Sequence, residues 1–183
     1  MCYTNHIALD NPRNDVFCMI GSAVVDAKAT RISVNCLLKD EQFKARLPRY
    51  MYATSIADGF DTMHLDRVQH TRIVQECKYR EETLVLVRRE GAYHTWDCLL
   101  EIFSYHLTVR FMQSEGLLAT DSALQVVFLD EHPDGPYAHL WAMFSRKSPM
   151  RKADLWRDGN TCVDRIILPL PGGSNPLFQG DWT

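Results

Sequence analysis

The sequence predicts an α/β fold with a parallel sheet, because strand patterns and helix patterns alternate through its central part. Continuous apolar residues at 84–87 indicate a buried strand, and a pattern with the period of a helix follows over 95–113. Two further apolar runs, at 124–130 and 162–168, predict two more strands. Because crossovers between neighbouring parallel strands are right-handed, we expect a parallel sheet with flanking helices.

The helix predicted at 95–113 carries one apolar stripe, whose members recur three or four residues apart. We expect this stripe to face the core. A second helix is predicted at 137–145, and a basic connector follows it at 146–157. Trp141 on this second helix, like Trp96 on the first, fits core packing better than stacking on a ligand. The stripe consists of Trp96, Leu99, Leu100, Phe103, Leu107 and Phe111.

The amino-terminal part, residues 1–80, is less regular. Its patterns predict a short strand at 16–20 that Gly21 ends. They also predict a half-exposed strand at 31–37 and a short helix at 40–47.

Length and composition fit one globular domain. The 183 residues suffice for a core of their own, and 46 % of them are hydrophobic. The net charge of −3 argues against a nucleic-acid surface. No apolar run approaches the ~20 residues of a membrane span, and residues 1–15 lack an apolar signal core. Taken alone, this amino end predicts a cytoplasmic protein.

Six dispersed cysteines leave two interpretations open. They could form disulfides in a lumenal protein, or they could be buried free thiols. None forms a C-x-x-C pair, which argues against a zinc ribbon or a thioredoxin-like site. The six are Cys2, Cys18, Cys36, Cys77, Cys98 and Cys162.

Three common functional motifs are missing from the chain. There is no G-x-G-x-x-G, no G-x-x-x-x-G-K-[ST] and no G-x-S-x-G. The sequence therefore disfavours dinucleotide binding, P-loop phosphate chemistry and an α/β-hydrolase.

Three titratable residues follow the first strand of the central part. His94, Asp97 and Glu101 share one face of the first helical turns, where the carboxyl end of a parallel strand places ligand sites. The plainer interpretation is structural: Asp97 would complement the helix dipole, His94 would cap the helix or be solvated, and Glu101 would pair with Arg110. The spacing could also place three metal ligands on one face, although such a set binds metal only modestly.

Three further blocks stand out along the sequence. They read R-R-E-G-x-Y-x-x-W-x-C-L-x-E-I at 88–102, L-D-E-H-P-D-G-P at 129–136, and L-P-L-P-G-G-S-N-P at 168–176 with Q-G-D-W at 179–182. These blocks resemble the family 61 glycosyltransferases, in particular their fungal branch, which is related to the EGF-domain-specific O-linked GlcNAc transferases. They occur in the family's order and together cover about residues 84–182.

The resemblance implies an inverting, metal-independent transferase of the GT-B type, in which two Rossmann-like domains face a cleft. It places the protein in the lumen of the endoplasmic reticulum or Golgi. Residues 1–183 would then be one Rossmann-like acceptor-side domain, with its core at 84–168. Residues 169–183 would lead to a donor domain that is missing. We expect such a chain to be inactive alone, with a nucleotide sugar and a protein or glycan acceptor as partners of the whole enzyme.

The helix departs from the family pattern, which has Asn, then His three residues later, then an acid four residues after that. This sequence has His94, Asp97 and Glu101 there, so only the acid is kept. We predict that Asp97 is the general base and that His94 and Glu101 belong to the same catalytic group. The changed positions also favour an alternative, a non-catalytic remnant that binds carbohydrate or a partner.

The loop after the next strand is predicted to border the same cleft. There, Asp130, His132 and Asp134 are candidates for binding acceptor hydroxyls. The alternative is a plain turn, which Pro133, Asp134 and Gly135 would form without any function.

The tail at 171–183 contains Leu177, Phe178 and Trp182, which are costly to expose together. We predict that this tail lies loosely on the surface and that the isolated chain self-associates through the exposed cleft face or expresses poorly.

Overall fold

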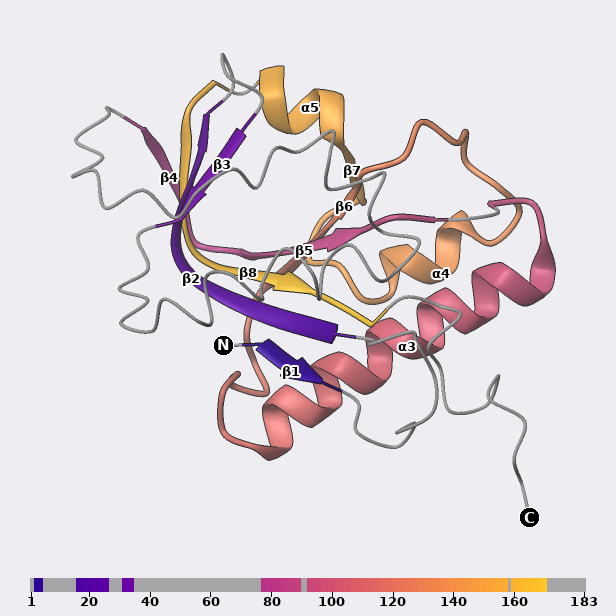
Figure 1. The fold of residues 1–183 in the computed structure, drawn as a ribbon. Coiled ribbons are helices and arrows are strands. Elements are labelled where there is room, and N and C mark those ends of the chain that lie inside the picture. Colours follow the sequence, from indigo (N-terminus) through magenta and orange to yellow (C-terminus); the bar gives the residue numbers. More distant parts are fainter. Residues whose placement is uncertain are drawn as a thin grey trace.

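The computed structural model shows one mixed sheet with helices on both of its sides (Figure 1). Its path runs β1-β2-β8-β5-β6-β7, with β3 paired to β2 and β4 paired to β8. Helix α3 runs along one side of the sheet, whereas α5 lies on the other (Figure 1). The structure describes residues 2–4, 16–26, 31–34, 77–89, 92–157 and 159–170.

The elements have the following bounds. The strands are β1 Cys2–Thr4, β2 Val16–Asp26, β3 Arg31–Val34, β4 Lys78–Arg80, β5 Thr83–Val87, β6 Leu124–Phe128, β7 Met150–Arg151 and β8 Thr161–Leu168. The described helices are α3 Thr95–Ser114, α4 Ala138–Ala142 and α5 Lys152–Arg157.

The sheet is mostly parallel, as predicted. β5 pairs in parallel with β6 and β8, β6 with β7, and β4 with β8. All five residues of β5 are buried, which fits a strand covered on both faces. The sequence therefore located the parallel core and its main helix correctly.

The amino-terminal strands differ from the prediction of a parallel sheet. β2 is antiparallel to β8, and β1 and β3 are both antiparallel to β2. Only four residues separate β2 from β3, and so short a connection permits antiparallel pairing alone.

Gly21 does not end the second strand, which contradicts the prediction made for it. β2 continues to Asp26, and Gly21 is paired with Arg165 of β8 inside the ladder. The backbone pairing of β2 with β8 holds the strand extended through the glycine, so the local signal for a turn is overridden.

The apolar stripe predicted for α3 faces the wrong way. Trp96 is 52 % exposed, Leu99 41 %, Phe103 37 % and Phe111 40 %, although Leu100 is buried. The helix instead packs its other side on β5, β6 and β8, through Cys98, Ile102, Tyr105, Val109 and Met112.

Buried polar residues on α3 explain why the apolar pattern of the sequence predicted the wrong side of the helix to be buried. Thr108 is buried, yet its hydroxyl donates to Ser104 O at 2.8 Å and accepts from Leu170 N–H at 3.1 Å. Because these bonds satisfy the hydroxyl, this side of the helix can enter the core despite its polar residues.

Trp141 lies in the core, as predicted, and is fully buried. Its ring meets Tyr105 and Phe128 edge-on, with centroids 5.8 Å and 5.6 Å apart. The helix that carries it, α4, is shorter than the predicted 137–145.

Residues 146–157 are more than a connector, because they contain β7 and α5. Asp154, in the first turn of α5, accepts a hydrogen bond from Arg151 N–H at 3.1 Å. This bond back to the residue before the helix caps its start. Arg157 then pairs with Asp154 one turn on.

Cysteines occur in two states among the described residues. Cys77 and Cys162 form a disulfide that joins the start of β4 to β8, and Cys98 is a buried free thiol. Both interpretations of the cysteines thus apply to part of the set. The helix predicted at 40–47 and the tail at 171–183 lie outside the described residues. No described helix is both long and apolar enough to span a membrane.

Candidate functional site

His94 and Asp97 form a hydrogen-bonded pair where β5 gives way to α3. The imidazole Nδ1 of His94 lies 2.9 Å from Oδ2 of Asp97, and the two side chains are 67 % and 42 % exposed. His94 is the N-cap residue of α3, but its side chain makes no capping bond to the helix backbone. Its ring is therefore held by the carboxylate and remains open to solvent.

Glu101 does not join this pair. Glu101 lies on the predicted face of the helix, but at this point of the helix the face is covered by the core. Glu101 is therefore only 5 % exposed. Its charge acts on the buried thiol of Cys98: burial raises the pKa of this thiol, and the charge of Glu101 raises it further. Among the described residues, no three His, Cys, Asp or Glu side chains gather to hold a metal ion.

Asp130, at the end of β6, is bound by a buried arginine. Arg89, which is 1 % exposed and follows β5, donates from Nη2 to Oδ1 of Asp130 at 2.7 Å. The backbone N–H of Arg89 donates to the other oxygen, Oδ2, at 2.8 Å. This ion pair joins the ends of two neighbouring parallel strands, and both carboxylate oxygens are used.

The same arginine holds the loop that follows Asp130. Arg89 Nη2 donates to His132 O at 2.5 Å, and its Nη1 donates to Pro133 O at 3.4 Å. Asp130 in turn accepts from His132 N–H at 3.0 Å. The guanidinium also lies over the ring of Phe128, 4.0 Å from its centroid. The backbone of this loop is thus set by groups from both strands.

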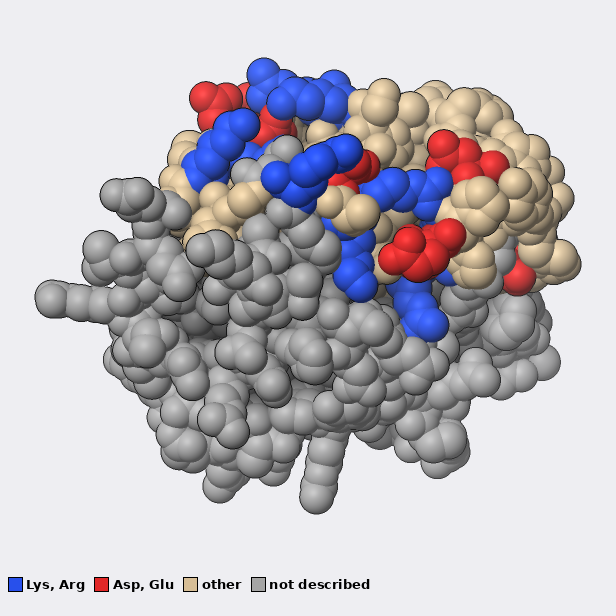
Figure 2. Space-filling model, turned by 90° about the horizontal axis from the view of Figure 1, so that it is seen from above, with Lys and Arg blue, Asp and Glu red and all other residues tan. Residues whose placement is uncertain are grey.

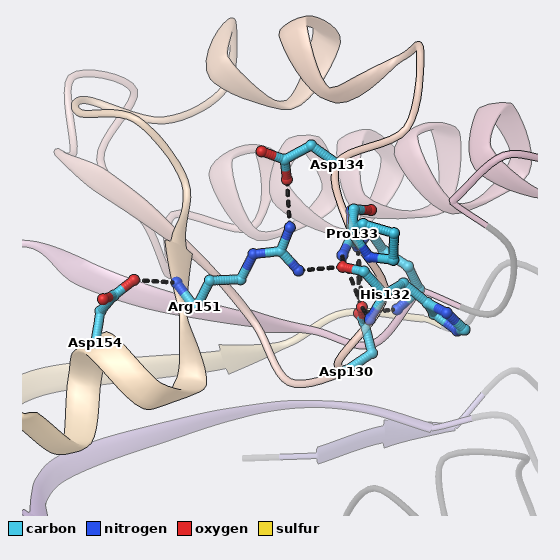
Figure 3. A network of polar contacts seen from close by, with 7 residues as sticks. Asp130, His132, Pro133, Asp134, Arg151 and Asp154 are labelled. Atoms are coloured by element: carbon cyan, nitrogen blue, oxygen red, sulfur yellow. Dashed lines mark hydrogen bonds and ion pairs between the residues drawn. The ribbon is translucent and has the colours of Figure 1, made fainter.

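A second arginine clamps the loop from β7 (Figure 3). Arg151 Nη1 donates to His132 O, and its Nη2 pairs with Asp134. The carboxylate of Asp154 accepts from the backbone N–H of Arg151 at 3.1 Å, and Figure 3 shows it on the side of Arg151 away from the loop. The side chain of Arg151 is therefore aimed at the loop by its place between β7 and α5.

The predicted acceptor residues thus divide into two kinds. The carboxylate of Asp130 is occupied by the arginine, whereas His132 and Asp134 lie exposed on the loop surface. The predicted turn at Pro133, Asp134 and Gly135 does not form: this stretch is irregular and is held by two arginines, and the turn comes after it, where Ala138 N–H donates to Gly135 O at 3.1 Å.

The loop touches the turn that precedes α3. A Cβ added to Gly135 would lie 1.8 Å from Ala92 O, so only glycine permits this approach. The hydroxyls of Thr95 and Tyr137 also meet at 2.8 Å. These contacts bring the His94–Asp97 pair and the loop to one edge of the sheet.

Sequence reasoning did not assign a role to Arg89 or Arg151. A signal existed for the first, because an arginine follows one buried strand and an aspartate follows the next. The carboxyl ends of adjacent parallel strands meet, so such a pair can be expected to bond. Nothing comparable marked Arg151 within the basic connector.

The described charges elsewhere are interleaved rather than gathered under one sign. Figure 2 shows basic side chains with acidic ones among them on the face seen from above. Lys147 bonds Glu82 at 2.6 Å, and this hydrogen bond lowers the pKa of the Glu82 carboxyl. Such pairing fits the small net charge of the chain.

Chemically, the His94–Asp97 pair can work as a base. A carboxylate that accepts from Nδ1–H fixes the tautomer in which Nε2 can take a proton. Comparison with known proteins adds no assignment: no protein-family model matches the chain, and no curated protein matches its sequence.

Proposed function

We propose that this chain is the acceptor-side, Rossmann-like domain of an inverting GT-B glycosyltransferase similar to family 61. The three sequence blocks at 88–102, 129–136 and 168–182 motivate the proposal. One structural observation supports it most: the first two blocks meet through Arg89 and Asp130 at the carboxyl edge of the sheet. Residues that serve one site need this proximity.

In this proposal His94 is the general base. Its Nε2 takes the proton of the acceptor hydroxyl while the hydroxyl oxygen bonds to the anomeric carbon. The bond from that carbon to the nucleoside diphosphate breaks at the same time, which inverts the configuration. Asp97 orients the ring, a role that replaces the direct base assigned to it from the sequence. Glu101, which is buried in the core, takes no direct part in this step.

The loop at 130–135 would present the acceptor. His132 and Asp134 are its exposed polar groups, and the clamp formed by Arg89 and Arg151 keeps them in place. A rigid loop of this kind lowers the entropy lost when a hydroxyl is positioned for attack. The donor sugar and its diphosphate would be held by the second domain, without a metal.

The proposed compartment is the secretory lumen. The disulfide between Cys77 and Cys162 supports it, because such bonds persist in oxidising compartments. A cytoplasmic location fits this bond less well.

Sugar transfer tests the proposal, measured with labelled nucleotide sugars and Ser/Thr peptides on a protein in which this chain is fused to a family 61 donor domain. We expect transfer without added metal, and His94→Ala should lower kcat by about 10²–10⁴-fold. His106→Ala is the matched control, since His106 is an exposed histidine on the same helix. Equal loss in both variants would reject His94 as the base, and tight binding of nucleotide sugar by the unfused chain would reject its assignment to the acceptor side.

A second candidate is a non-catalytic module that binds carbohydrate or a partner through the same loop. The altered residues at 94 and 97 favour it. It predicts that Asp134→Asn weakens binding of glycans or glycopeptides, while His94→Ala leaves that binding unchanged and no fusion transfers sugar.

A further inference from the structure

The outward side of α3 is unusually apolar for a helix facing solvent. Trp96, Leu99 and Phe103 are exposed by 52 %, 41 % and 37 %, and Leu107 continues the row half-buried. We call these four residues the α3 row. They repeat at intervals of three and four, so they follow one line along a helix of 20 residues, about 30 Å long. A contiguous exposed row of this kind is a candidate interaction surface.

The row is complementary to itself. If a second α3 is laid antiparallel with Phe103 facing Phe103, Leu99 faces Leu107 of the other copy. In the same register Trp96 faces Arg110, an exposed arginine near the carboxyl end of the helix. The pairs are apolar on apolar in the middle, and cation on aromatic ring at both ends.

We propose that two copies of this chain pair through the α3 row, antiparallel, around a two-fold axis at Phe103. The symmetry is that of an isologous dimer, in which each contact occurs twice. Antiparallel helices also bring opposite ends of their dipoles together, and Glu115 would then lie near the amino end of the other helix. The surface differs from the cleft face through which the sequence predicted self-association.

The apolar area that the α3 row can bury limits the strength of the dimer. An aromatic side chain buries about 150–250 Å² when fully covered, so the row and its neighbours offer roughly 400 Å² per copy. A total of about 800 Å² lies below the ~1,200 Å² of standard stable complexes. We therefore expect a weak dimer that dissociates on dilution. This dimer is independent of the proposed transferase activity.

Sedimentation velocity over a concentration series tests the dimer. The wild-type chain should shift from monomer to dimer, and Phe103→Glu should weaken the association at least 10-fold because two carboxylates would face each other. Met143→Glu is the matched control, since Met143 is 76 % exposed and lies off the row. A wild-type chain that stays monomeric to several hundred μM overturns the proposal, as does equal weakening by Met143→Glu. Circular dichroism checks that both variants keep their helix content.

Single cysteines test the register. Under mild oxidation Phe103→Cys should give covalent dimers, because this position meets itself across the axis. Leu99→Cys alone should link at least 10-fold more slowly, and a mixture of Leu99→Cys with Leu107→Cys should restore linking. The wild-type chain corrects for its native cysteines. Equal linking at positions 99 and 103 would overturn the antiparallel register.

Discussion

Two neighbouring regions at the carboxyl edge of the sheet are built in opposite ways. The loop after β6 is clamped by a buried ion pair, a second arginine and a glycine that admits no side chain. The start of α3 has an exposed histidine at its N-cap and no side-chain capping bond. Several contacts therefore stabilise the loop, whereas the start of α3 beside it lacks a side-chain capping bond that would stabilise the helix. Sites that perform chemistry often depart from the most stable choice of residue, which is the pattern at His94.

Removing Arg89 should have the largest effect. Arg89→Met would leave the Asp130 carboxylate buried without its cation, at a cost of about 3–5 kcal/mol in the free energy of unfolding. Urea denaturation measures this cost. Arg110→Met, which removes an exposed arginine, should cost little, and Arg89→Met with Asp130→Leu should recover much of the loss. A cost below about 1 kcal/mol for the single change would mean that the clamp is not what stabilises this loop.

A substitution at Gly135 tests the contact between the loop after β6 and the turn before α3. Gly135→Ala would force the loop away from Ala92 O and should cost about 1–3 kcal/mol, as overpacking does. Gly21→Ala is the control, because its added Cβ would have no neighbour closer than 4.0 Å. If both variants melt at the same temperature, the two loops do not press together as described.

Arg151 should matter less than Arg89 because its ion pair is partly exposed. Arg151→Ala should lower the free energy of unfolding by about 1 kcal/mol, mostly through the lost bonds to the loop backbone. Arg157→Ala, an exposed arginine on α5, should cost less than that. In the fused transferase, Arg151→Ala should raise KM for the acceptor more than it lowers kcat. A fall in kcat alone would speak against a role in presenting the acceptor.

The smallest effect should be a gain in stability. His94→Asn introduces a side chain that can accept from the free N–H groups of the first turn, which should stabilise the chain by about 0.5–1 kcal/mol. The same change should abolish transfer in the fused protein, because the base is gone. His106→Asn lies within the helix and should not stabilise it. A destabilising effect of His94→Asn would show that the histidine already caps the helix as well as asparagine.

The position of the site could be predicted from the sequence. The apolar runs at 84–87 and 124–130 locate two strands, and the rule that parallel strands bring their carboxyl ends together places His94, Asp97 and the loop at one edge. The sequence predicted only some of the residues that make up the candidate site. His94 and Asp97 lie together because three residues separate them on one chain, whereas the clamp depends on Arg151, which comes from β7, beyond the reach of any local pattern.

The sequence by itself determined where the central strands and α3 begin and end, because hydrophobic period and turn residues act over a few positions of the chain. Tertiary structure alone decided which side of α3 is buried. Both sides carry large apolar residues, so the choice fell to partners distant in sequence: Trp141 against Tyr105, and Leu170 N–H on Thr108. The same holds for the antiparallel pairing of β2 with β8, whose residues are more than a hundred positions apart. Their register depends on a ladder that exists only when both strands are in place.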